Sequence, residues 1–143
     1  MKDTFLKITT KLKTITELKW IDADEGQLDY YDNPPVTFPC ALVDIDMPSC
    51  DDINSESQQC KVRITIRLAF LPTGQSNTAV PVLVQTNALK RYETIKKIYQ
   101  ALQGYGDSEM SELSRVSQTN EKRDDALKVV QQVWETSFEE SVD

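Results

Sequence analysis

The strongest constraint on the fold is a run of strict alternation between residues 59 and 70. Every second position is apolar, and the positions between are mostly Lys, Arg or Thr; the apolar set is Cys60, Val62, Ile64, Ile66, Leu68 and Phe70. Successive side chains of a β-strand point to opposite faces, so this period of two predicts a long strand with one buried and one solvated face. A slip of one residue would expose every apolar side chain, so the pattern also predicts a fixed register.

The remaining sequence predicts two helices and further strands around this one. Residues 3–18 and 81–103 carry apolar side chains at helical spacing. Strands are expected at 20–24, 36–47, 110–118 and 127–138, with an exposed acidic connection at 48–57 and a hairpin loop at 119–125. The 127–138 segment also fits a helical stripe, but its β-branched residues Val129, Val130, Val133 and Thr136 favour a strand.

This order of elements predicts the α+β fold class, with two helices packed on one face of a mostly antiparallel sheet. The strand at 36–47 is expected to pair with the strand at 59–70 in antiparallel fashion. The chain has 143 residues and contains no internal repeat or linker, so residues 1–143 are expected to form a single domain. The first 19 residues contain no apolar run typical of a signal peptide or membrane helix, so no membrane partner is expected.

Charge is unevenly distributed along the chain. The formal net charge is −7, which disfavours nucleic acid as a partner. No Lys or Arg occurs from Trp20 to Cys60, whereas the first helix is basic. Two interpretations stay open: solvated faces joined by internal ion pairs, or head-to-tail association of copies through unlike patches. The charged interface candidates are Lys7, Lys11, Lys13, Asp22, Asp24, Asp51 and Asp52.

A second kind of contact is suggested by the loop at residues 29–35. Tyr30 and Tyr31 lie there beside two prolines, outside any apolar stripe. Exposed tyrosines are effective anchors for protein contacts. The alternative is that both rings fold back over the edge of the sheet.

The chemistry available to the chain is narrow. It has no histidine, which removes the usual general base and the commonest transition-metal ligand. Its three cysteines form no CxxC pair, and Cys40 and Cys60 are expected in the core as reduced thiols. No glycine-rich phosphate loop is present. We therefore expect no cofactor and no metal.

Carboxylates are the remaining candidates for catalysis. The Asp22–Gly26 segment is acidic, but its glycine does not fall at the position that a calcium-binding EF-hand loop requires. Asp44 and Asp46 share one strand face and could perform acid–base chemistry if they were buried together. On an exposed face they would serve solubility instead. The chain is therefore not expected to be an enzyme.

Two segments resemble a known family. The chain resembles the tail-terminator and tail-completion proteins of long-tailed bacteriophages and prophages in two segments: the short strand Trp20-Ile21-Asp22 and the stretch Pro34-Pro35-Val36-Thr37-Phe38-Pro39-Cys40-Ala41-Leu42-Val43. As in that family, the alternating strand, a helix and a hairpin follow. The resemblance covers most of the chain in element order, and Pro35–Val43 carries its sequence signal.

This resemblance implies a structural role in phage assembly. It implies a homo-oligomer, a hexameric ring, that contacts tail-tube and head–tail connector proteins. Such a protein would be found in the host cytoplasm during assembly and in the virion afterwards. A different function class stays open: a small acidic binding or inhibitor module that uses residues 22–56 to occupy a basic site.

Overall fold

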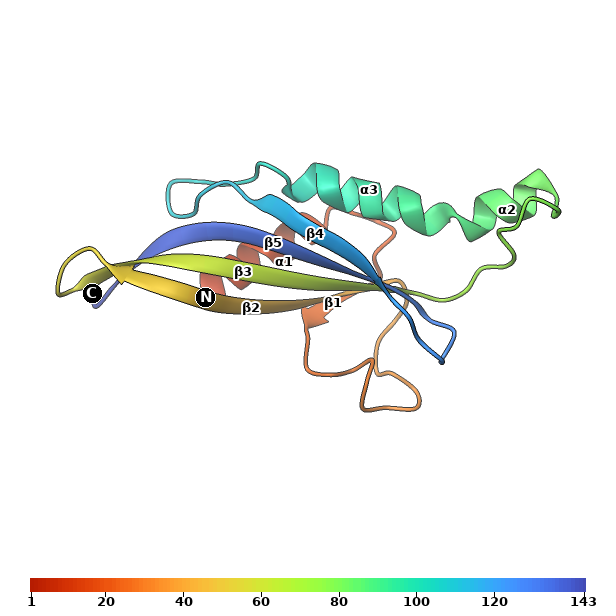
Figure 1. The fold of residues 1–143 in the computed structure, drawn as a ribbon, viewed down its shortest axis with the longest axis horizontal. Coiled ribbons are helices and arrows are strands. Elements are labelled where there is room, and N and C mark those ends of the chain that lie inside the picture. Colours follow the sequence, from red (N-terminus) through yellow and green to blue (C-terminus); the bar gives the residue numbers. More distant parts are fainter.

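The computed structural model describes residues 1–143 and contains three helices and five strands (Figure 1). In chain order these are α1 (Lys2–Leu12), β1 (Trp20–Ala23), β2 (Cys40–Asp52), β3 (Ser57–Phe70), α2 (Val82–Ala88), α3 (Lys90–Leu102), β4 (Ser114–Glu121) and β5 (Lys128–Ser141). The sheet order is β1-β2-β3-β5-β4. Only the β1–β2 pair is parallel, so the predicted α+β class with a mostly antiparallel sheet is confirmed.

The central strand is β3, the segment with the strict alternation. It pairs along its length with β2 on one side and β5 on the other. All its alternating apolar residues, from Cys60 to Phe70, are buried. The predicted strand and its buried face are therefore confirmed.

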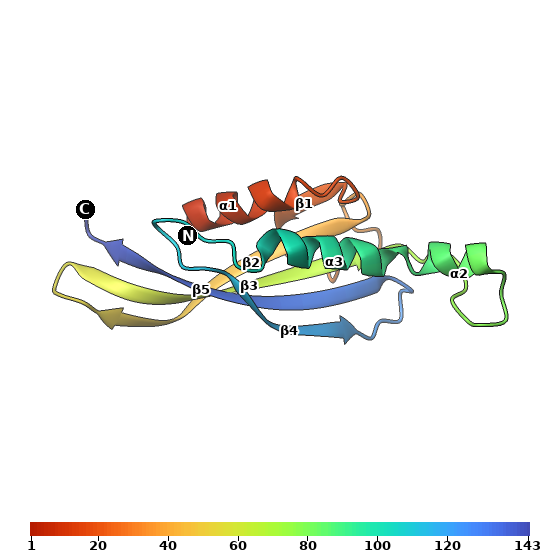
Figure 2. The same ribbon diagram turned by 90° about the horizontal axis from the view of Figure 1, so that it is seen from above.

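Helices α1 and α3 cover one face of the sheet (Figure 2). Ile8 and Leu12 of α1 and Ile98 and Leu102 of α3 are fully buried in the main core. They meet the apolar face of β3 and Trp134 of β5, which is also fully buried. Burying such side chains, at about 1.5–3 kcal/mol each, is what holds the helices on the sheet.

The opposite face of the sheet has two parts. At one end, the connection between β1 and β2 covers a second apolar cluster that includes Leu28, Leu42 and Val129. The rest of this face is open, and Asp44 and Asp46 of β2 are exposed on it. These two carboxylates therefore lack the shared burial that acid–base catalysis at this position would require.

The prediction of an exposed connection at residues 48–57 is wrong, because most of this segment is strand. Strand β2 continues to Asp52 and β3 begins at Ser57, with a bulge in register between Asp46 and Ser49. The sequence predicts a loop because Pro48 and the acidic residues are typical of loops. In the structure the pairing of β1 with β2 ends at Val43, so the rest of β2 is an edge strand. Proline is tolerated at edges and bulges because its missing N–H need not enter a ladder.

Both predicted helices are shorter in the structure. Helix α1 ends at Leu12, and turns carry Ile15 and Leu18 into the core instead. The Thr14 hydroxyl donates to the Lys11 carbonyl oxygen, a local bond that competes with helical pairing. The expected 81–103 helix is divided at Leu89, whose φ of −97° and ψ of 2° leave the helical region.

The remaining strand predictions differ from the structure at their ends: β2 begins at Cys40, not at residue 36, and β4 runs to Glu121, three residues into the hairpin loop predicted at 119–125. Strand β1 ends one residue earlier than expected, and β4 begins at Ser114 because Met110 makes only an isolated bridge to Phe138. Of residues 127–138, all but Leu127 fall within β5, so the strand interpretation is confirmed. Cys40 and Cys60 are buried, as predicted.

The molecule is elongated, and different elements form its two ends (Figure 1). The β2–β3 hairpin forms an arm at one end, whereas α2 projects at the other. No helix has both the length and the apolar character needed to cross a bilayer.

Candidate interaction surfaces

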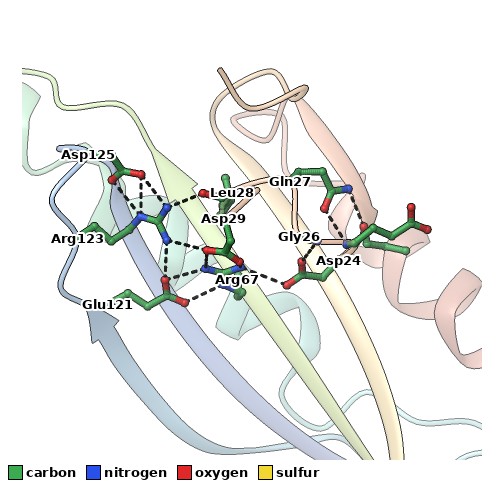
Figure 3. A network of polar contacts seen from close by, with 11 residues as sticks. Asp24, Gly26, Gln27, Leu28, Asp29, Arg67, Glu121, Arg123 and Asp125 are labelled. Carbon is green, nitrogen blue, oxygen red and sulfur yellow. Dashed lines mark hydrogen bonds and ion pairs between the residues drawn. The ribbon is translucent and has the colours of Figure 1, made fainter. Parts of the chain in front are cut away.

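An ion-pair network fixes the β1–β2 connection to the sheet (Figure 3). Arg67 is on the polar face of β3, and its side chain is only 11% exposed. Its Nε donates to Glu121 Oε1 at 2.7 Å, and its Nη1 donates to Asp29 Oδ2 at 2.9 Å. Asp24 Oδ2 lies 3.6 Å from the same Nη1. One guanidinium therefore joins the connection, the central strand and the end of β4.

A second arginine completes the network from the β4–β5 loop. Arg123 Nη2 donates to the Leu28 carbonyl oxygen at 2.7 Å and to Asp125 Oδ2 at 2.7 Å. Its Nη1 donates to Asp29 Oδ1 at 3.3 Å. Asp29 therefore receives hydrogen bonds from both guanidinium groups, which ties the connection to strand β3 and to the β4–β5 loop.

The network shifts the protonation of its carboxylates. Hydrogen bonds from Arg67, opposed by partial burial, hold the pKa of Asp29 and that of Glu121 below their ordinary values. The pKa of Asp125 is lowered chiefly by its hydrogen bond from Arg123. All three carboxylates are therefore ionised at neutral pH, which favours an electrostatic anchor.

The predicted tyrosine pair lies on this anchored connection. Tyr30 is 82% exposed and Tyr31 is 56% exposed, so neither ring folds back over the sheet edge as the alternative held. Gly26 has a φ of +84°, and a Cβ at this position would collide with the Tyr30 ring. The backbone N–H of Tyr30 also donates to the Gly26 carbonyl oxygen. A glycine turn thus holds an exposed aromatic ring at a defined place.

The predicted lysines differ in their availability. Lys7 Nζ lies 2.8 Å from Asp107 Oδ2, and Lys11 Nζ lies 4.5 Å from the centroid of the Tyr105 ring. Both are thus engaged within the molecule, which agrees with the interpretation of internal ion pairs for Lys7. Lys13 is exposed and has no ion pair.

The predicted aspartates fall into two groups. Asp22 and Asp24 are half-buried and accept local hydrogen bonds, Asp22 from the Ala23 N–H within β1 and Asp24 from the Gly26 N–H in the β1–β2 connection. Asp51 and Asp52 are exposed near the tip of the β2–β3 arm. The structure therefore separates these carboxylates and does not gather them into one continuous face.

An apolar surface that the sequence analysis missed lies on α2. Val82 is 76% exposed, Leu83 is 84% exposed and Val84 is 40% exposed. The preceding loop bonds back to the helix by polar contacts: the Thr73 hydroxyl donates to the Asn87 carbonyl oxygen, and Gln85 Nε2 donates to the Ser76 carbonyl oxygen. The first turn of α2 is left uncovered.

A signal for this surface was present in the sequence. No Asp, Glu, Lys or Arg occurs from Leu68 to Leu89, in a chain that is 27% charged. Depletion of charge is characteristic of the centres of protein–protein interfaces. The sequence predicts a helix from residue 81 onward, but its buried side chains begin only at Ala88.

No group of three or more Cys, Asp or Glu side chains is arranged to hold a metal ion. The exposed features are instead an anchored tyrosine loop, an uncharged apolar helix and an acidic arm. Exposed aromatic and uncharged apolar side chains of this kind are common at protein–protein interfaces.

Comparison with known proteins adds one finding on the fold. No protein-family model matches the sequence, and a search of curated proteins finds no match. Among solved structures, a chain from the virion of a native gene transfer agent particle is similar, with a TM-score of 0.53 and 10% sequence identity. The similarity covers 93% of this chain and 92% of that chain. The two chains therefore share a fold over nearly their whole lengths.

Proposed function

We propose that this protein is a structural subunit of a phage-like particle, and that it acts in tail assembly as a tail-terminator-like ring. The observation that carries the proposal is the shared fold with a chain of a gene transfer agent virion, which covers 93% of this chain and 92% of that chain. A fold alone does not fix a function, so the surfaces must also suit the role. The resemblance of the element order and of the Pro35–Val43 stretch to tail-terminator proteins points in the same direction.

The exposed surfaces suit a subunit that acts by contact. The first turn of α2 offers three neighbouring apolar side chains at one end of an elongated molecule. A ring needs heterologous contacts, in which one patch of a subunit meets a different patch of the next. We assign the α2 surface to contact with a neighbouring copy, and the tyrosine loop to contact with tail-tube or connector proteins. Neither contact requires a catalytic residue.

The acidic binding module is the weaker candidate. It would need the carboxylates of residues 22–56 on one continuous face. Asp24 and Asp29 instead face Arg67 within the molecule, whereas Asp51 and Asp52 lie far away on the arm. The charge of this segment is therefore partly used in holding the fold together.

The proposal is tested by measuring oligomeric state with size-exclusion chromatography and light scattering over a wide range of concentration. A discrete ring-sized species is expected, and cryo-electron microscopy of this species should show closed rings. A second measurement adds purified tail tubes, which should acquire the protein at one end only. A strict monomer at the highest concentration that also fails to bind tube ends would overturn the proposal.

A further inference from the structure

Two cysteines face each other across the β2–β3 arm. Cys50 of β2 is directly opposite Cys60 of β3 in the antiparallel register. Both are free thiols. The spacing of the two backbones permits a disulfide bond. Directly opposed residues in antiparallel strands have Cα atoms about 4.5–5.5 Å apart, and disulfides span about 4.4–6.8 Å between Cα atoms.

The β-bulge in β2 creates this pairing. Asp46 pairs with Arg63, but after the bulge Ser49 pairs with Lys61. Without the extra residue, Cys50 would lie opposite Gln59. The bulge therefore re-aims this part of β2 so that the two thiols meet, which is a common role of bulges in sheets.

The two thiols differ in their surroundings. Cys50 is exposed, whereas Cys60 is fully buried. Burial, reinforced by the adjacent Cys50 thiol, raises the pKa of Cys60 to about 11. Cys50 is therefore the thiol that an external reagent reaches first, and Cys60 is placed directly behind it. The third cysteine, Cys40, is buried in the cluster on the opposite face of the sheet.

We propose that Cys50 and Cys60 are a thiol–disulfide site, which a small-molecule disulfide such as oxidised glutathione converts to a cross-strand bond. The thiolate of Cys50 attacks one sulfur of the oxidised glutathione, forming a mixed disulfide and releasing one glutathione thiolate. The thiolate of Cys60 then attacks the Cys50 sulfur and releases the second glutathione thiolate. The two cysteines are oxidised, one glutathione disulfide is reduced to two thiols, and the cysteine protons pass to water or to the released thiolates.

The bond would join the two strands of the arm just before its tip. Beyond Val43 the outer edge of β2 has no strand partner, so this part of the arm depends on its pairing with β3. A covalent link there limits separation of the strands in the oxidised protein. This site is independent of the proposed tail function, because it rests on register and burial alone.

The test treats the native protein with oxidised glutathione and follows intact mass and peptide maps after alkylation. The expected product has lost two hydrogen masses, carries a Cys50–Cys60 peptide link and retains a single alkylatable thiol at Cys40 after denaturation. Reduction should restore the original mass. A glutathione adduct that persists on Cys50, or a link that involves Cys40 or a second chain, would overturn the proposal.

Two variants sharpen the result. Cys60→Ser should stop at the mixed disulfide and accumulate a glutathione adduct on Cys50. Cys40→Ser is the matched control and should form the same cross-strand bond as the native chain. Because the principal measurement uses the native protein, a variant that fails to fold does not remove the test.

Discussion

Arg67 is a charged residue that the fold has nearly removed from water. It stands on the polar face of β3, where alternation alone predicts a solvated side chain, yet the β1–β2 connection closes over it. Arg67→Gln would leave Asp29 and Glu121 without their strongest donor. We expect a loss of about 2 kcal/mol in the free energy of unfolding, measured by urea denaturation.

The neighbouring arginine provides the control for this substitution. Arg63 lies four residues before Arg67 on the same face of β3, but it is exposed and makes no ion pair. Arg63→Gln should change the free energy of unfolding by less than about 0.5 kcal/mol. Equal losses in the two variants would show that the network around Arg67 does not stabilise the fold.

The same network predicts how stability depends on pH. The pKa values of Asp29 and Glu121 are lowered in the folded state from their ordinary values of 3.8 and 4.5. Their contribution is therefore fully present above the unfolded pKa values and is lost as pH falls through the folded ones. Urea denaturation from pH 7 to pH 3 should show native stability falling below about pH 4.5. The Arg67→Gln variant should lose less over this interval, and a slope as steep as that of the native protein would contradict the assignment.

A buried polar chain in the main core gives a further prediction. Trp134 Nε1 donates to Gln132 Oε1 at 3.1 Å, and both side chains are fully buried. Gln132→Leu would leave the indole N–H without an acceptor, at a cost of about 1–3 kcal/mol in the free energy of unfolding. Adding Trp134→Phe removes the orphaned donor. The double variant should therefore lose less free energy of unfolding than the sum of the losses of the two single variants. Gln131→Leu, on the opposite face of β5, is the control and should show no coupling with Trp134→Phe.

At the scale of elements, the strength of the periodic signal decided which predictions succeeded. In β3 every second side chain is buried, so the alternation in the sequence corresponds directly to the structure. In α2 the apolar residues Val82, Leu83 and Val84 are consecutive, and no period distinguishes a buried helix start from an exposed one. The outer part of β2 carries polar residues on both faces, so pairing with β3 alone defines it as strand.

Helix α2 carries the prediction on assembly. Leu83→Glu places a charge at the most exposed apolar position of this helix. If α2 contacts a neighbouring copy, losing burial of this side chain should cost about 2 kcal/mol, or roughly a 30-fold increase in the dissociation constant. Thr86→Glu, also exposed on α2, is the control for added charge. Light scattering should show weaker association for Leu83→Glu than for Thr86→Glu, and identical association would exclude the first turn of α2 as the contact.

At the scale of the whole molecule, the sequence predicted the layers of the fold but not the contacts that close it. Arg67, Glu121 and Arg123 are distant in sequence from Asp29, and no local pattern relates them. They meet because β3 and the β4–β5 hairpin lie beside the β1–β2 connection. The exposed tyrosines were found from composition, since Tyr30 and Tyr31 sit among polar and proline residues outside any apolar stripe.

The uncharged character of α2 and its approaches has a thermal consequence. Burial of apolar surface lowers the heat capacity, and the resulting attraction weakens as water is cooled. Ion pairs such as those of Arg67 do not share this dependence, because their strength does not come from releasing water around apolar groups. If copies of the chain associate through α2 as proposed, their association should weaken near freezing while each subunit stays folded. Cooling would then separate the copies without unfolding them.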